Sequence, residues 1–154
     1  MTNSDTSQTI RGLNELLRGE LSALDTYDQA LAVLTDDPAV KDDLRECRAS
    51  HSDRVERLRM EIVERGGQPD SESGAWGVFA KAIEGSAATF GWKMAVMALE
   101  AGEDHGVKEY DHLMPSLDGA ARDILSIAVY PQQLRTHKIM SALKHRQGDS
   151  SPSA

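Results

Sequence analysis

The stretch RGELSALDTYDQAL, residues 18–31, has a counterpart in AGEDHGVKEYDHLM, residues 101–114. Each contains Gly-Glu, then six residues, then Tyr-Asp, and the second copy follows the first at an offset of 83 residues. Residues seven apart on an α-helix point within about 20° of the same direction. The glutamate and the tyrosine of each copy therefore share one face of a helix, and the repeat predicts two helices of related design.

The glutamates fall on the apolar stripe of each predicted helix. Around Glu20 and Tyr27, apolar residues recur at steps of four and three, which is the spacing of an inward-facing stripe: Leu13, Leu17, Leu24, Leu31 and Leu34. Glu103 and Tyr110 lie on a similar stripe formed by Val96, Leu99 and Leu113. A lone buried carboxylate loses its hydration at a high cost in free energy. Each glutamate is therefore expected either to bind a metal ion, to join a hydrogen-bonded network, or to reach water at the edge of the stripe.

Two histidines occupy comparable places in the helices that follow. His51 lies between Cys47 and Val55, and His137 lies between Leu134 and Met140. We therefore expect each half of the chain to direct one carboxylate and one imidazole toward the axis of the fold. Carboxylate and imidazole groups are common ligands of iron, manganese and zinc in helical bundles.

The apolar periodicity predicts four helices, at about residues 9–35, 38–65, 87–114 and 117–146. No segment alternates with the period of a strand, so the expected fold class is all-α. We expect a four-helix bundle of two related hairpins with a long connection between the second and third helices, in which residues 74–83 could form a short extra helix. Pro131 should kink or divide the fourth helix, because proline lacks the backbone donor.

The predicted organisation is one domain, residues 9–146, with a disordered N-terminus at 1–8 and a disordered tail at 147–154. The net charge of −8 argues against a nucleic-acid partner, which would need a concentrated positive face. No apolar run reaches the roughly 20 residues of a membrane span, and the polar start does not resemble a signal peptide. We expect a cytoplasmic homo-oligomer, taken as a dimer, with a protein partner as a further possibility.

These features together resemble the ferritin-like superfamily. The layout is similar to that of a bacterial family of small, uncharacterised ferritin-like proteins, through GGQP at residues 66–69 and EAGEDHGVKEY at residues 100–110. In the di-iron members, each half supplies a Glu from one helix and a Glu-x-x-His from the next. The resemblance implies an iron or manganese site with four candidate ligands: Glu20, His51, Glu103 and His137.

The sequence departs from that pattern at the two bridging carboxylates. The residue three before His51 is Arg48, and the residue three before His137 is Leu134. Two divalent ions need about four carboxylates for neutrality, and Arg48 would add positive charge instead. Arg48 is therefore interpreted as a counter-charge for the buried glutamates, with Tyr27 and Tyr110 as neighbours of the site.

Two functions follow from these residues. The first is a metal-free bundle with a buried polar network, acting as a structural or partner-binding protein. The alternative is a di-iron or di-manganese oxidase, a peroxide scavenger or an iron-handling protein that uses the four ligands, with a single bound ion as an intermediate case. The arginine-rich and glutamate-rich residues 53–65 are interpreted as a solvent-facing surface, as are Glu109 and His112.

Overall fold

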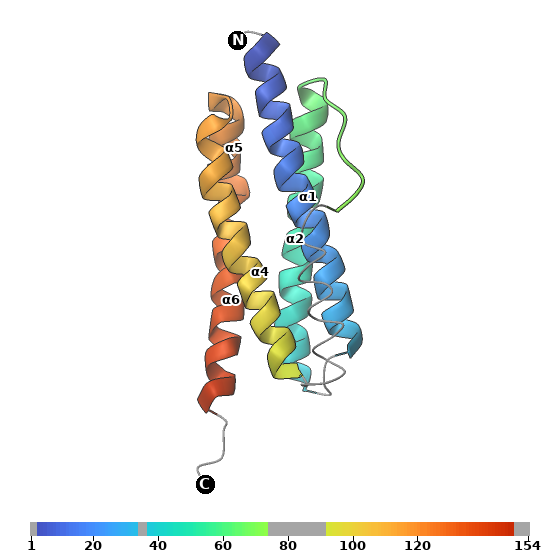
Figure 1. Ribbon diagram of the computed structural model, residues 1–154, viewed down its shortest axis with the longest axis vertical. Helices are drawn as coiled ribbons and strands as arrows, with labels where there is room; N and C mark the ends of the chain where they lie inside the picture. The colour runs from blue at the N-terminus through green and yellow to red at the C-terminus, as the bar shows by residue number, and fades with distance from the viewer. Residues whose placement is uncertain (1–2, 34–36, 74–91, 150–154) are drawn as a thin grey trace.

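A computed structural model describes residues 3–33, 37–73 and 92–149. Within these ranges the chain is helical, without strands, and its long helices lie side by side along the long axis (Figure 1). Their bounds are α1 Asn3–Val33, α2 Pro38–Glu64, α4 Trp92–Leu113, η1 Met114–Ser116, α5 Gly119–Ala128 and α6 Tyr130–Asp149. The all-α prediction is confirmed, and no helix of the described residues is long and apolar enough to cross a membrane.

The chain packs as two helix pairs, α1 against α2 and α4 against α6, with the partners running in opposite directions (Figure 1). Asp37 caps the start of α2 by accepting hydrogen bonds from the backbone N–H groups of Ala39 and Val40. Pro38 follows in the first turn, where its missing N–H has no helical partner to lose. The helix ends before Gly66, whose φ of 75° is readily adopted only by glycine.

The fourth helical segment is divided rather than merely kinked. Helix α5 begins at a cap made by Asp118, whose carboxylate accepts from the backbone N–H of Ala121, and it ends at Ala128. Val129 separates it from α6, and Pro131 lies in the first turn of α6. A proline is tolerated in this position because the first turn of a helix has free N–H groups in any case.

Some predicted boundaries differ from the structure. Residues 3–8 belong to α1, so the expectation of disorder does not hold for them, and α6 continues to Asp149. The short helix expected at residues 74–83 lies outside the described residues.

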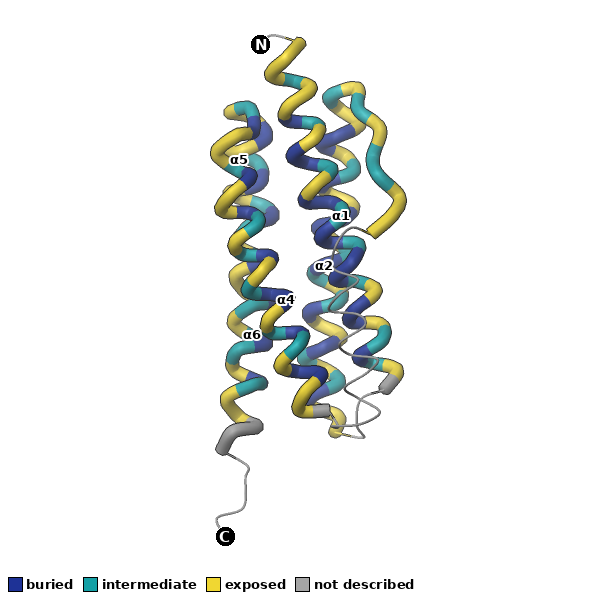
Figure 2. The backbone as a smooth tube through the Cα atoms, viewed as in Figure 1, coloured by how far each residue is buried: buried dark blue, intermediate teal, exposed yellow. Residues whose placement is uncertain are grey.

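The repeat is visible in the pattern of burial. Every buried residue of α4 has a buried counterpart in α1 at the offset of 83; the α4 set is Ala95, Val96, Leu99, Gly102, Glu103, Gly106, Tyr110 and Leu113. Figure 2 shows buried positions in dark blue recurring along the long helices. The match is partial for the second helix of each pair. At an offset of 82, the buried residues 47, 51, 54, 58 and 61 correspond to the buried residues 129, 133, 136, 140 and 143, whereas the buried residues 40, 44, 55 and 62 have no buried counterpart.

This second offset changes which face of α6 is buried. Leu134 was expected to lie inward, but its side chain is 43% exposed. The inward stripe of α6 passes through Gln133 and Thr136 instead, and it continues the steps of four and three from Ala121, Leu125 and Val129.

Candidate functional site

Two carboxylates meet near the axis of the bundle. Glu20 of α1 is 3% exposed and Glu103 of α4 is 1% exposed. Both lie on the inward stripes predicted from the sequence, so helix geometry alone brings them to the interior. Their burial requires compensating partners, which come from all four long helices.

His51 of α2 joins the two carboxylates. Its Nδ1 lies 2.6 Å from Oε2 of Glu20, and its Nε2 lies 2.9 Å from Oε1 of Glu103. Because an ionised carboxylate only accepts hydrogen bonds, the two contacts favour the imidazolium form, in which both ring nitrogens donate. Burial and the charge of Arg54 oppose this form, but the two glutamates outweigh them and raise the pKa of His51.

Arg54 supplies a second buried cation. Its side chain has 0% exposure, its Nε donates to Oε1 of Glu20 over 2.9 Å, and its Nη1 donates to Oγ of Ser50 over 3.1 Å. The remaining nitrogen, Nη2, lies against the ring of His51, 2.6 Å from Nδ1 and 3.1 Å from Nε2. Two carboxylates, one guanidinium and one imidazolium give a cluster with no net charge.

The two tyrosines cross between the helix pairs. Tyr27 of α1 donates to Oε1 of Glu103 over 2.5 Å, and Tyr110 of α4 donates to Oε1 of Glu20 over 2.6 Å. Each tyrosine therefore serves the glutamate of the other copy of the repeat. Burial and the adjacent carboxylate raise the pKa of both phenols well above 10, so both remain donors.

Helix α6 completes the partners of Glu103. Gln133 Nε2 and Thr136 Oγ1 donate to its Oε2 over 2.9 Å and 2.7 Å.

Burial raises the pKa of each glutamate, but the surrounding charges and hydrogen bonds lower it by more. The pKa of Glu103 is lowered, mainly by His51, and the pKa of Glu20 falls from 4.5 to about 2, mainly through Arg54 and His51. Both carboxylates are thus held in the ionised form.

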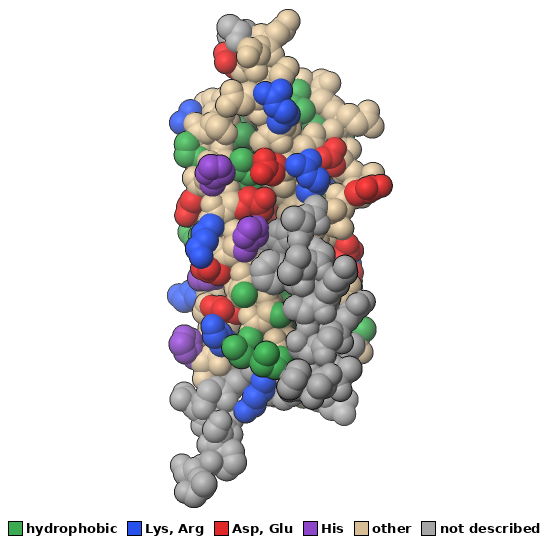
Figure 3. Space-filling view, in the orientation of Figure 1, with side chains coloured by type: hydrophobic (Ala, Val, Ile, Leu, Met, Phe, Trp, Pro, Cys, Tyr) green, Lys and Arg blue, Asp and Glu red, His purple; other side chains and the backbone are tan. Residues whose placement is uncertain are grey.

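The structure brings five of the predicted site residues together: Glu20, Tyr27, His51, Glu103 and Tyr110. His137 is not among them, because its side chain is 31% exposed and lies 3.9 Å from Asp104. The position equivalent to His51 is Gln133. Figure 3 shows a face of the molecule on which acidic, basic and histidine side chains are interspersed.

The interpretation of Arg48 as the counter-charge was wrong. Arg48 lies at the surface and forms a two-bond ion pair with Asp28, through Nε at 2.6 Å and Nη2 at 3.0 Å. Six residues further along α2, Arg54 points to the axis and takes the role that was assigned to Arg48.

Comparison with known proteins identifies a family. The model of a family described as "Domain of unknown function (DUF2383)" matches residues 8–116. The chain belongs to this family. No curated protein and no solved structure matches the chain. The matched residues of the DUF2383 domain contain both glutamates, both tyrosines, His51 and Arg54, whereas Gln133 and Thr136 lie beyond them.

The candidate metal ligands in this DUF2383 chain do not fit a di-metal centre. Glu103 receives four hydrogen bonds and Glu20 receives three, while both nitrogens of His51 are engaged. A carboxylate has about four lone-pair directions, so little remains for a metal ion. The guanidinium of Arg54 also repels a cation. Among the described residues, no group of three or more His, Cys, Asp or Glu side chains is arranged to hold a metal.

Three residues of the network were missed in the sequence: Arg54, Gln133 and Thr136. The signal for Arg54 was present, since Cys47, His51, Arg54 and Leu58 follow the same steps of four and three as the stripe on the first helix. The arginine was assigned to the solvent face because of its charge. Gln133 and Thr136 lie on a stripe of the same spacing, between Val129 and Met140. They were missed because both are polar and because the inward face was inferred from Leu134.

Proposed function

We propose that this chain is a ferritin-like bundle in which a buried ionic network replaces a metal centre, and that it acts as a structural or partner-binding protein. The observation that carries the proposal is Arg54, a guanidinium bonded to Glu20 inside the cluster. It supplies positive charge where a metal-binding bundle would need carboxylates. The network then serves to hold the two helix pairs in register.

A second candidate, a di-iron or di-manganese oxidase or iron-handling protein, draws support from one fact. Glu20, His51 and Glu103 converge within hydrogen-bonding distance at the axis. Carboxylate and imidazole groups at such a position are typical of metal-binding bundles. This candidate requires Arg54 to leave the cluster and the present hydrogen bonds to be exchanged for metal bonds.

The test is elemental analysis of purified protein before and after anaerobic loading with Fe(II) or Mn(II). The Glu20→Gln/Glu103→Gln variant, which removes both carboxylates, is the control. We expect wild type and control to retain the same trace of metal, far below one ion per chain, and to show no oxygen or peroxide consumption. About one or two ions per chain that are lost in the control would overturn the proposal.

Light scattering of the same samples measures the oligomeric state. We propose a dimer, from the expectation drawn from the sequence. A monomeric mass at all concentrations would contradict that part of the proposal without affecting the metal result.

A further inference from the structure

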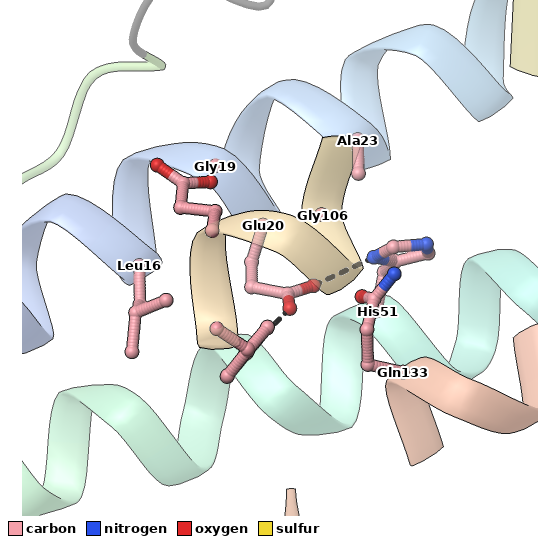
Figure 4. A pocket seen from close by; sticks show the side chains of 9 residues that line it. Leu16, Gly19, Glu20, Ala23, His51, Gly106 and Gln133 are labelled. Atoms are coloured by element: carbon pink, nitrogen blue, oxygen red, sulfur yellow. Dashed lines mark hydrogen bonds and ion pairs between the residues drawn. The ribbon is translucent and has the colours of Figure 1, made fainter. Parts of the chain in front are cut away.

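A small cavity adjoins the network on one side. It has a volume of about 10 Å³ and is bounded by the glycines Gly19 of α1 and Gly106 of α4, together with Leu16, Glu20, Ala23, His51, Glu109, Tyr110 and Gln133. Figure 4 shows Glu20 reaching from α1 toward His51 beside these two glycines. A polar cavity of roughly 10–15 Å³ is the smallest that holds one water molecule.

The glutamate that lines the cavity accepts fewer hydrogen bonds than the glutamate that does not. Four donors occupy both oxygens of Glu103, which does not line the cavity. Glu20 does line it and receives three: two donors reach Oε1, and His51 alone reaches Oε2. Because an ionised carboxylate oxygen accepts about two hydrogen bonds, Oε2 of Glu20 retains one acceptor direction.

We propose that this cavity is a binding site for a single water molecule, which donates to Oε2 of Glu20 and connects the buried network to solvent between α1 and α4. An internal water needs two to four polar partners. Besides Glu20, the polar side chains of His51, Glu109, Tyr110 and Gln133 line the cavity, and the rest of its lining is apolar. Glu109 is half-buried. The inference rests on the proposed metal-free network.

This water gives the proton of His51 a route of exchange. The proton on Nδ1 passes to Oε2 of Glu20, which yields a neutral imidazole and a neutral carboxylic acid. The acid then passes its proton to the water, and a solvent proton returns by the same steps. Charges and protons balance, and no other reactant is needed. Without the water, exchange would wait for local unfolding of the bundle.

The experiment is NMR of ¹⁵N-labelled, EDTA-treated protein whose lack of metal is checked by elemental analysis. Of the five histidines, His51 is the one fully buried among the described residues, so its ring N–H groups are the ones expected to be protected. We expect a cross-peak between the Nδ1 proton and bound water. The Gly19→Ala variant places a methyl group in the cavity and should slow solvent exchange at His51 by about tenfold or more.

Gly119→Ala is the matched control, because a Cβ at that position meets nothing within 4 Å. It should leave the exchange rate unchanged. Ala23→Val fills the same cavity from the next turn of α1 and replaces the first variant if Gly19→Ala does not fold. An unchanged exchange rate in a folded cavity-filling variant, or no water cross-peak in wild type, would overturn the water site. Metal retention in the untreated protein would instead overturn the proposed function, so the two failures are distinguishable.

Discussion

Arg54 is a fully buried arginine on a helix whose sequence is rich in surface charge. Its value to the fold depends on Glu20, since a guanidinium without a carboxylate partner would be costly to bury. The two glutamates depend on Arg54 in turn, because Glu20 and Glu103 together carry two negative charges that His51 alone cannot neutralise.

Replacing Arg54 by Ala should therefore destabilise the protein strongly. Removal of one partner from a buried ion pair costs about 3–5 kcal/mol, because it leaves the other charge uncompensated. Urea unfolding followed by circular dichroism measures the change in the free energy of unfolding.

Arg48→Ala is the control for this experiment. Arg48 forms its ion pair with Asp28 at the surface, where such pairs contribute at most about 1 kcal/mol. Equal losses in the two variants would contradict the role of Arg54 as the internal counter-charge.

At the same scale, the sequence predicted the burial of Glu20, Glu103, Tyr27 and Tyr110 but not all of their partners. The burial of Glu61, in the stretch assigned to the surface, was missed. Glu20 and Tyr110 could be placed because helix geometry fixes the face on which each residue lies. Arg54 lies on the same kind of stripe, but its charge favoured the surface interpretation. For this residue, charge predicted an exposed side chain and periodicity predicted a buried one. The hydrogen bond with Glu20 in the interior agrees with the prediction from periodicity.

Among the helices, α6 shows where sequence patterns fail. Its inward face was inferred from Leu134 and Met140, and this choice also placed His137 at the axis. The buried stripe instead runs through Val129, Gln133, Thr136 and Met140 in steps of four and three, which leaves Leu134 exposed. Because two neighbouring positions of this stripe are polar, an apolar pattern alone does not show its phase.

The cap of α5 gives a prediction at the level of the element. Asp118 accepts from the N–H of Ala121 and pairs with Arg65, the residue that follows α2, through a 2.9 Å contact from Nε. The hydrogen bond with Arg65 is the main cause of the lowered pKa of Asp118. Asp118→Ala should cost about 2–3 kcal/mol, since it removes both a helix cap and a partly buried ion pair.

Asp37→Ala is the comparison, because Asp37 caps α2 from an exposed position. Its loss should cost about 1 kcal/mol, the usual value of a cap. Thermal unfolding of both variants measures the difference, and equal costs would show that the pair with Arg65 adds no stability.

For the whole molecule, the ionic network predicts how stability depends on pH. The pKa of Glu20 falls from 4.5 to about 2 on folding, so its contribution is complete above pH 4.5 and is lost as the pH falls toward 2. This shift corresponds to roughly 3 kcal/mol. The pKa of His51 is raised above 6.5, so its contribution is complete below pH 6.5 and is lost as the pH rises through the raised value.

Urea unfolding at a series of pH values should therefore show a loss of stability on both sides of the interval between 4.5 and 6.5. In Glu20→Gln the acid side should be flatter, whereas the exposed Glu56→Gln should follow wild type. An acid limb of the same steepness in Glu20→Gln would show that other carboxyl groups cause it.

The all-helical architecture could be predicted without knowledge of the ionic network, because apolar periodicity over long segments was enough to predict it.

Because each tyrosine bonds the glutamate of the other half, substitutions in one half of the chain should depend on the residues of the other half. Tyr27 in one half serves Glu103 in the other, and Tyr110 serves Glu20 in return. A mutation that removes a tyrosine deletes one donor to the carboxylate of the opposite half, and a mutation that removes a glutamate deletes the carboxylate acceptor of a buried phenol, which is costly. Divergence after a duplication would then have to proceed in matched steps, so neither copy of the repeat can drift independently of the other.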